Sequence, residues 1–374
     1  MITHLKPLIC FTLLSMLSVS AMANTVVNNN NKREVSVYVS SDSFSNILPL
    51  KQLIKDEWQQ APSDESSHAF TQNELGISLN WNNIIFNVAH RLDYFVSTHS
   101  DTAEAFYLER SDLPLTTKNR YEVDLRLHHQ QSNGIRLGYQ WDFNSFTAQV
   151  NLGYWDVTAT RESELTGQVS GNQNNDITGR AELIEFYSDK NFLKRGNNNE
   201  WETDGYGVTV DLSLAWQFNQ ELHINLDVKD LYSKFKLKKI GFSQGYIDTD
   251  GNSINSLGGQ SYLPLYRGVE GKKDHQFELP EHINAIVAYN LTSVNKALSL
   301  LARYKRQGEI DFYYLGTQWQ HSQYAQTRLM FDLENLSPEI QYSNHWLMFK
   351  LGIDELNIDK VKQVNLGLSI NAVF

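Results

Sequence analysis

The chain has 374 residues, a formal net charge of −11 and a mean hydropathy of −0.43, with 41% hydrophobic residues. The acidic balance argues against nucleic acid as a partner, because binding to a phosphate backbone relies on Lys and Arg. The one cysteine of the sequence is Cys10, so the rest of the chain has no side chain for a disulfide, a thiolate metal site or a cysteine nucleophile.

Residues 1–23 have the pattern of a secretory signal peptide. Lys6 supplies a positive start, Leu8–Leu17 is a short apolar core, and Ala21–Ala23 matches the small-x-small cleavage pattern. An uncleaved membrane anchor is the alternative, but the apolar run is too short to span a bilayer as a helix. We therefore expect export, cleavage near Ala23 and a mature chain that begins at Asn24.

Residues 24–73 are largely hydrophilic and are predicted to form an N-terminal extension or loop. Alternation at Val35–Val39 predicts at most one short strand. Helical spacing relates four apolar residues further on, which predicts a short helix: Ile47, Leu50, Ile54 and Trp58. A periplasmic extension, a plug-like helix and a loop helix all stay open, and the loop is the default interpretation.

From residue 74 to the C-terminus, apolar and polar residues alternate in many segments. Successive side chains of a strand point to opposite faces, so such segments predict strands with one apolar and one polar face. The clearest are residues 121–128, 146–154, 208–217, 222–229 and 328–333; further ones are 75–81, 84–96, 135–142, 281–291, 297–305, 310–319, 344–352 and 361–374. Strands of about 9–11 residues suit a membrane, whereas those of soluble sandwiches average about 5–6. We predict an all-β fold, a transmembrane antiparallel β-barrel over residues 74–374 with about 12–16 strands and about fourteen as the best count.

The long connections do not fit this strand assignment. They cover residues 97–120, 160–205 and 237–280. Three predicted strands separate the first two, which would place them on opposite sides of the membrane, whereas outer-membrane barrels keep long loops outside. Either one strand is assigned wrongly or one long segment is periplasmic.

Charged residues on the polar strand faces are candidates for the lumen: Glu122, Asp124, Arg126, Asp211, Asp227, Lys229, Arg328 and Asp332. Mixed charge inside a barrel either defines a selective water-filled path or forms a packed network that stiffens the wall without conducting. Both interpretations stay open. No zinc signature or phosphate-binding glycine loop is present, so neither a metal nor a cofactor is expected.

Aromatic residues recur near predicted strand ends, as in the girdles that lie at headgroup depth in transmembrane barrels. The tryptophans assigned to a girdle are Trp81, Trp141, Trp155, Trp216, Trp319 and Trp346.

Residues 128–134 have the sequence His-His-Gln-Gln-Ser-Asn-Gly, which suggests an alternative function, that of an enzyme. Outer-membrane phospholipases and lipid A deacylases place a catalytic His shortly before Ser-Asn, where it activates the Ser hydroxyl. Here Gln130 stands where the phospholipase His would be, and Ser-Asn-Gly is a good turn sequence. The sequence favours a turn and no enzyme, with a lipid hydrolase using Ser132 and His129 as the alternative.

The C-terminal strand carries the most specific pattern. Its apolar residues alternate with polar ones up to the terminal Phe374: Val364, Leu366, Leu368, Ile370 and Ala372. In this the chain resembles the Gram-negative outer-membrane β-barrel proteins as a general, porin-like class, whose last strand ends in an aromatic residue. The resemblance implies an assembly signal read by the barrel-assembly machinery, formed by Leu366, Leu368, Ile370 and Phe374.

The same resemblance implies a place in the bacterial outer membrane, with its lipid and lipopolysaccharide as further partners. It makes a channel or transporter for small hydrophilic or amphipathic solutes the leading hypothesis. A barrel without transport, acting in surface assembly, adhesion or an envelope complex, is the second hypothesis, and a lipid-modifying enzyme the third. The sequence indicates neither the solute nor the oligomeric state.

Overall fold

A computed structural model describes residues 33–374 except 56, 116–117, 172–176, 189–203, 250–251, 255–259, 263–265 and 292–296. The signal peptide, its cleavage near Ala23 and the start of the mature chain at Asn24 lie outside the described residues.

Long strands dominate the described part of the chain, and two short helices lie between them. The strands are β1 (Arg33–Ser45), β2 (His68–Trp81), β3 (Ile84–Thr98), β4 (Tyr121–Asp142), β5 (Phe146–Gly171), β6 (Ile177–Tyr187), β7 (Asp204–Gln217), β8 (Leu222–Asp248), β9 (Asn252–Ile254), β10 (Gln260–Tyr262), β11 (Tyr266–Phe277), β12 (His282–Asn290), β13 (Leu298–Gln307), β14 (Ile310–Ser322), β15 (Ala325–Asp332), β16 (Pro338–Ser343), β17 (Leu347–Ile353) and β18 (Gln363–Val373). The helices are α1 (Leu50–Lys55) and α2 (Ser100–Arg110).

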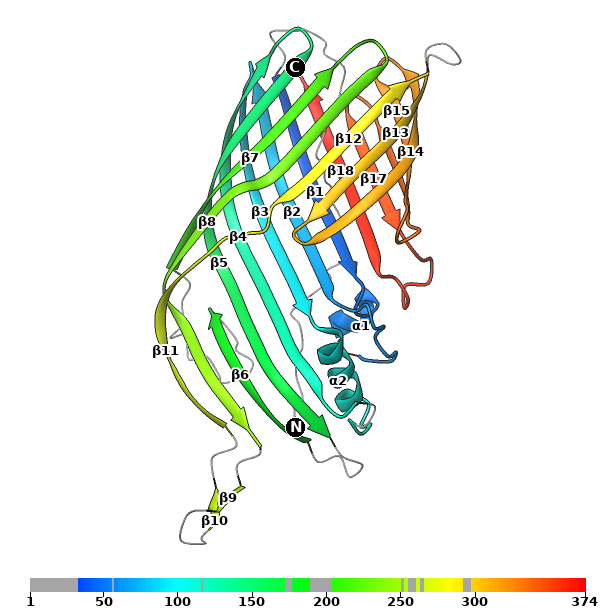
Figure 1. Ribbon diagram of the computed structural model, residues 1–374. Coiled ribbons are helices and arrows are strands. Elements are labelled where there is room, and N and C mark those ends of the chain that lie inside the picture. The colour runs from blue at the N-terminus through cyan, green and yellow to red at the C-terminus, as the bar shows by residue number, and fades with distance from the viewer. Residues whose placement is uncertain are drawn as a thin grey trace.

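Among the described residues, 14 strands form a closed antiparallel barrel (Figure 1). Their order is β1-β2-β3-β4-β5-β7-β8-β12-β13-β14-β15-β16-β17-β18, and β18 pairs with β1, for example Ile370 with Val37. Closure leaves no unpaired edge in this ring, which is what a sheet in lipid requires. The predicted fold class and the best strand count are confirmed.

The barrel begins earlier than the sequence predicted. Residues 33–45 form β1 and pair along their length with both β2 and β18, so the ring starts at Arg33 and not at residue 74. The segment looked like an extension because the lumen face of β1 is hydrophilic, with Ser36, Ser40 and Asp42 on it. Residues 46–67 connect β1 to β2 and contain α1, at the position of the predicted helix.

The turn predicted at residues 128–134 is wrong. β4 runs through this segment as one strand of 22 residues, paired on both sides with β3 and β5. Gly134 serves packing here, because a Cβ at this position would lie 2.2 Å from Cε3 of Trp155 on β5. With one strand in place of two, the first two long connections lie at the same end of the barrel, and the conflict over loop sides disappears.

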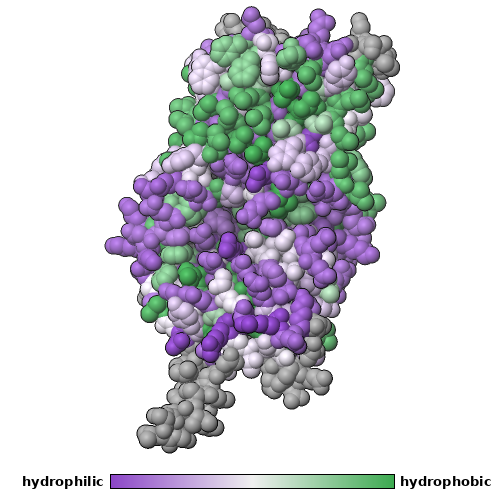
Figure 2. Space-filling view, in the orientation of Figure 1, coloured by the Kyte–Doolittle hydropathy of each residue, from purple (hydrophilic) through white to green (hydrophobic). Residues whose placement is uncertain are grey.

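The outer wall of the ring is apolar and its inner wall is polar. Leu137 and Leu152, a cross-strand pair, are 58% and 60% exposed on the outside, while the neighbouring Arg136 and Asn151 face inward. Figure 2 shows hydrophobic residues over the upper part of the molecule and hydrophilic residues over the lower part. The apolar part has the character of a lipid-facing belt.

An aromatic girdle marks one rim of this belt. Five of the six tryptophans assigned to it are exposed at this rim: Trp81, Trp141, Trp216, Trp319 and Trp346. The sixth assignment is wrong, because Trp155 is 1% exposed and its indole N–H donates to Thr209 inside the barrel, at 2.9 Å.

Both described chain ends lie at this rim, where Arg33 N–H donates to the carbonyl of Phe374 at 3.2 Å. Short turns share the rim, at residues 82–83, 143–145, 218–221, 323–324 and 344–346. Outer-membrane barrels have short periplasmic turns and longer outer loops, so this end corresponds to the periplasmic side.

At the other end, part of the wall extends well past the apolar belt. The lower half of β5 pairs with β6, and the lower half of β8 pairs with β6 and β11 (Figure 1). α1 and α2 pack near Ala69 and Val96, on the sheet face opposite to that of Phe70 and Phe95. No helix among the described residues is long and apolar enough to cross a membrane.

Candidate functional site: the barrel lumen

A cavity of about 300 Å³ lies inside the ring, lined by residues from all of its strands except β14. Its titratable lining residues are Asp42, Glu74, Arg91, Asp93, Arg136, Asp211, Asp227, Lys229, His282, Arg303, Lys305, Arg328 and Lys350. We call them the charged layer. Alternation places them inside: each stands on the face opposite to the apolar belt, so one strand supplies both surfaces.

A bulge in β8 adds charge to this layer. Between Val210 and Leu212 of β7 the register shifts, so that three residues of β8, Lys229, Asp230 and Leu231, lie opposite the single Asp211. Asp230 has a φ of 54°, and its N–H donates to Asp211 Oδ1 at 2.9 Å. Extra residues in a bulge re-aim side chains, and here both Lys229 and Asp230 reach the interior.

Charge-assisted hydrogen bonds cross the lumen from β8 to β2 and β3. Arg91 of β3 forms a bidentate pair with Asp230, with N–O distances of 2.9 and 2.6 Å, and also an ion pair with Asp93. Lys229 lies 3.6 Å from Glu74 of β2. Bidentate Arg–carboxylate pairs are directional, so they hold the two walls at a fixed spacing.

Arg136 of β4 is the centre of a second group. It forms an ion pair with Glu74 and lies 3.5 Å from Asp211 Oδ2. It also donates to Tyr38 Oη at 2.7 Å and to Asn87 Oδ1 at 3.1 Å, while Tyr38 donates to Glu74 at 2.5 Å. A buried charge is tolerated when it has such partners.

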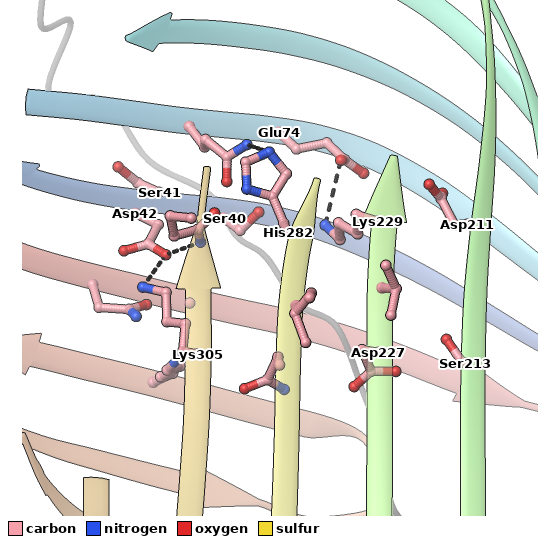
Figure 3. Close-up of a pocket in the computed structure, with 18 of the residues that line it drawn as sticks. Ser40, Ser41, Asp42, Glu74, Asp211, Ser213, Asp227, Lys229, His282 and Lys305 are labelled. Carbon is pink, nitrogen blue, oxygen red and sulfur yellow. Dashed lines mark hydrogen bonds and ion pairs between the residues drawn. The ribbon is translucent and has the colours of Figure 1, made fainter. Parts of the chain in front are cut away.

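The opposite part of the lumen has its own pairs. Arg303 of β13 donates to both oxygens of Glu339, at 2.5 and 3.1 Å, and Lys350 lies 3.2 Å from the same carboxylate. Lys305 forms an ion pair with Asp42 of β1, which again crosses the lumen (Figure 3). His282 makes a further crossing with Gln72 of β2, at 2.6 Å (Figure 3).

Two charged residues of the cavity lining stay outside this network. Arg328 donates from Nε to Gln318 at 2.7 Å, and no carboxylate lies within ion-pair distance of it in the described part of the chain. Asp227 has no cation within that distance among the described residues, and its Oδ1 accepts no hydrogen bond there. In the described part of the chain, these two are therefore the lining charges that no ion pair neutralises.

An aromatic layer follows the charged layer toward the extended end. We define it as Phe44, Phe70, Phe95, His128, Phe235, Phe277 and Phe312. On β1, β2 and β3 its members stand two residues beyond a residue of the cavity lining, for example Phe44 beyond Asp42 and Phe95 beyond Asp93.

Ring contacts join the members of this layer. Across the interior, the centroid of Phe312 lies 5.1 Å from that of Phe44, and that of Phe277 lies 4.9 Å from that of His128. Phe277 also stacks at 5.0 Å on Phe235, its pairing partner on the neighbouring strand β8. The link between β11 and β12 holds Phe277 inward, because Leu279 N–H donates to Ser233 Oγ at 2.7 Å and its carbonyl accepts from the same hydroxyl at 3.2 Å.

The structure separates the predicted lumen residues into three groups. Four line the cavity: Asp211, Asp227, Lys229 and Arg328. Asp332 is fully buried on β15, where it binds Gln363 and the N–H of Glu334. The last three lie on β4 beyond the aromatic layer, near Glu164 of β5: Glu122, Asp124 and Arg126.

Sequence reasoning missed several cavity residues: Glu74, Arg91, Arg136, Arg303, Lys305 and Lys350. A single charge within an otherwise apolar strand segment was the available signal, as at Arg136 between Ile135 and Leu137. The sequence pattern does not show which residues pair with these charges, because the partners come from strands far away in sequence.

The candidate hydrolase residues do not come together. Ser132 is fully buried in β4, and its hydroxyl accepts from Gln130 Nε2 at 3.3 Å. The ring of His129 lies 5.7 Å from that of Tyr94, which lies on the opposite sheet face from Arg91, the cross-strand partner of Ser132. A Ser–His pair for nucleophilic attack requires hydrogen-bond contact, and the described residues provide none at this position.

No protein-family model matches the chain, and no curated protein matches it. Solved structures similar to it include the toluene transporter TodX of P. putida, with 12% identity, 92% of this chain and 88% of that one covered, and a TM-score of 0.38. The Ralstonia pickettii toluene transporter TbuX follows with 9% identity, 92% and 90% coverage and a TM-score of 0.41, and a Pseudomonas aeruginosa FadL homologue with 10%, 92% and 88%, and 0.37.

At such identities and scores these likenesses support no functional argument. The closed ring, the lipid-facing belt, the girdle and the polar interior come from the structure itself. By its fold, the chain is a porin-like β-barrel of the outer-membrane type.

Proposed function

We propose that the protein is a gated channel for small solutes in the bacterial outer membrane. The observation that carries the proposal is the cavity of about 300 Å³ in the middle of the ring, lined by charged side chains and closed toward the outer end by the aromatic layer. A barrel filled only for stability would pack its interior to the density of a protein core. A polar cavity with an unpaired Arg328 and Asp227 suits a solute path instead.

Two structural elements account for the closed state. Pairs that cross the lumen, such as Arg91 with Asp230 and Lys305 with Asp42, hold opposite walls together at the charged layer. Beyond them, Phe277 and Leu279 occupy the interior from the β11–β12 link. This link is held by two hydrogen bonds between Leu279 and the Ser233 hydroxyl and by one from Gly308 N–H to the Glu281 carbonyl, and it is the part of the closure that opens in this proposal.

Single-channel recording in planar bilayers tests the proposal. We expect small discrete conductance steps from the purified, folded barrel and larger steps after Phe277→Ala, because the substitution removes a ring that contacts His128 across the interior. Phe86→Ala is the matched control, since Phe86 is exposed on the lipid-facing wall and its loss should leave the step size unchanged.

Inserted barrels that give no steps, with or without Phe277, would refute a channel and support a role in surface assembly or an envelope complex. Insertion is checked by the shift in electrophoretic migration on heating, which folded barrels show and unfolded chains do not.

A further inference from the structure

The charges of the lumen are distributed unevenly. The part formed by β2–β8 holds five carboxylates and three cations: Glu74, Asp93, Asp211, Asp227 and Asp230 against Arg91, Arg136 and Lys229. The part formed by β13–β18 with β1 holds four cations and two carboxylates: Arg303, Lys305, Arg328 and Lys350 against Asp42 and Glu339. Overall the two sets balance.

Other titratable groups do not cancel this difference. Asp332, on the same strand as Arg328, accepts only from neutral N–H groups and adds a third carboxylate to the cation-rich part, which still leaves one cation in excess there. His282 of β12 lies between the two parts, with Nε2 bonded to Gln72. One part therefore carries an excess of negative charge and the other an excess of positive charge.

In each part, the ion pairs leave one charged side chain without a partner of opposite charge. Arg328 is 8% exposed, and its only hydrogen bond in the described part of the chain uses Nε, so its two Nη groups remain for an acceptor in the cavity. A guanidinium fork suits a carboxylate. Asp227 lies on β8, with the β12–β14 segment of the wall between it and Arg328. Its carboxylate lines the cavity with Oδ1 enclosed, and no cation of the described residues lies within ion-pair distance of it.

We propose that the channel prefers dipolar solutes, small molecules that carry one cationic and one carboxylate group. The cationic group faces Asp227 and the acid-rich part, and the carboxylate faces Arg328 and the cation-rich part. A molecule with only a positive or only a negative charge is attracted to one part and repelled by the other. A neutral molecule is attracted to neither. The preference rests on the proposed channel function.

Flux of radiolabelled solutes from proteoliposomes tests this. Glycine betaine and choline differ mainly by one carboxylate, lactate is an anion of similar size, and erythritol is neutral. We expect glycine betaine to pass faster than the other three. Asp227→Asn combined with Arg328→Gln should reduce its advantage over erythritol about two- to fivefold, the size of one partly solvated charge pair.

Two variants serve as comparisons. Arg126→Gln with Glu164→Gln makes the same change of charge on the exposed extension, where these two residues lie 3.6 Å apart, and should keep the preference. Arg328→Lys retains the positive charge and should keep most of the preference for glycine betaine. This variant shows whether a loss of preference in the double variant comes from the removed charges or from misfolding.

The outcomes separate the two proposals. If no solute passes through folded, inserted barrels, the channel function itself is refuted. If all four solutes pass at rates set by size alone, or if the double variant keeps the advantage of glycine betaine, the channel stands and the dipolar preference is overturned.

Discussion

Gly134→Ala tests the unbroken course of β4 through the lumen wall. A Cβ at Gly134 would lie 2.2 Å from Cε3 and 2.5 Å from Cδ2 of Trp155, so the indole must move. Its displacement breaks the 2.9 Å hydrogen bond to Thr209 and disturbs the Arg136 guanidinium, 5.4 Å from the ring centroid. Overpacking costs about 1–3 kcal/mol and a lost hydrogen bond about 0.5–1.5 kcal/mol. We expect the free energy of unfolding to fall by about 2–4 kcal/mol.

Urea unfolding in lipid vesicles, followed by the heat-dependent shift in electrophoretic migration, measures this loss. Gly271→Ala is the matched control, because a Cβ there meets no atom within 4 Å, and it should change stability by less than about 0.5 kcal/mol. Trp155→Leu removes the clash, so Gly134→Ala should cost far less in that background, with a coupling of about 1–3 kcal/mol. Additive effects would show that the two residues are not in contact and that the segment turns, as its Ser-Asn-Gly sequence suggests.

Two further predictions concern the ends of the molecule. Burial alone would raise the pKa of the Asp101 carboxyl in α2, but the Lys118 ammonium and the Glu122 N–H together hold it below its usual value. The contact therefore stabilises the loop at neutral pH and is lost as the pH falls through the lowered pKa. Asp101→Asn should speed amide exchange of α2 about two- to fivefold at pH 7, and its effect should disappear as the wild-type carboxyl becomes protonated. Equal amide exchange rates of α2 in the wild type and the variant at pH 7 would contradict this prediction. Deletion of Phe374 should reduce the fraction of heat-modifiable barrel in cells, whereas Val373→Ala should not; equal fractions would argue against the assembly signal.

The ring could be predicted from the sequence because lipid imposes one requirement on every strand. Leu137 and Leu152 had to be apolar, and their neighbours Arg136 and Asn151 did not. Only a short strand at Val35–Val39 was predicted in place of β1, because its inward face includes Ser36, Ser40 and Asp42 and its apolar face is short. β4 was divided in two because glycine beside Ser-Asn usually indicates a turn, whereas here the glycine makes room for an indole ring.

The site could be predicted only as a set of inward-facing charges. Alternation identified Asp211, Asp227, Lys229 and Arg328, but not which charges meet. Arg91 and Asp230 are 139 positions apart, and their contact depends on the strand order and on a bulge. The alternation of apolar and polar residues contains neither the strand order nor the bulge. Paired and unpaired charges could therefore be told apart only with the structure.

The described residues contain no cysteine, which allows a direct test of the central claim that each strand faces lipid on one side and a solute path on the other. Asn151→Cys and Leu152→Cys differ by one position on β5, with Asn151 in the cavity lining and Leu152 on the outer wall. In intact outer membranes, a small water-soluble thiosulfonate should modify Asn151→Cys and spare Leu152→Cys, and a lipid-borne quencher should affect only a fluorophore at Leu152→Cys. Modification of the second thiol and protection of the first would contradict the account.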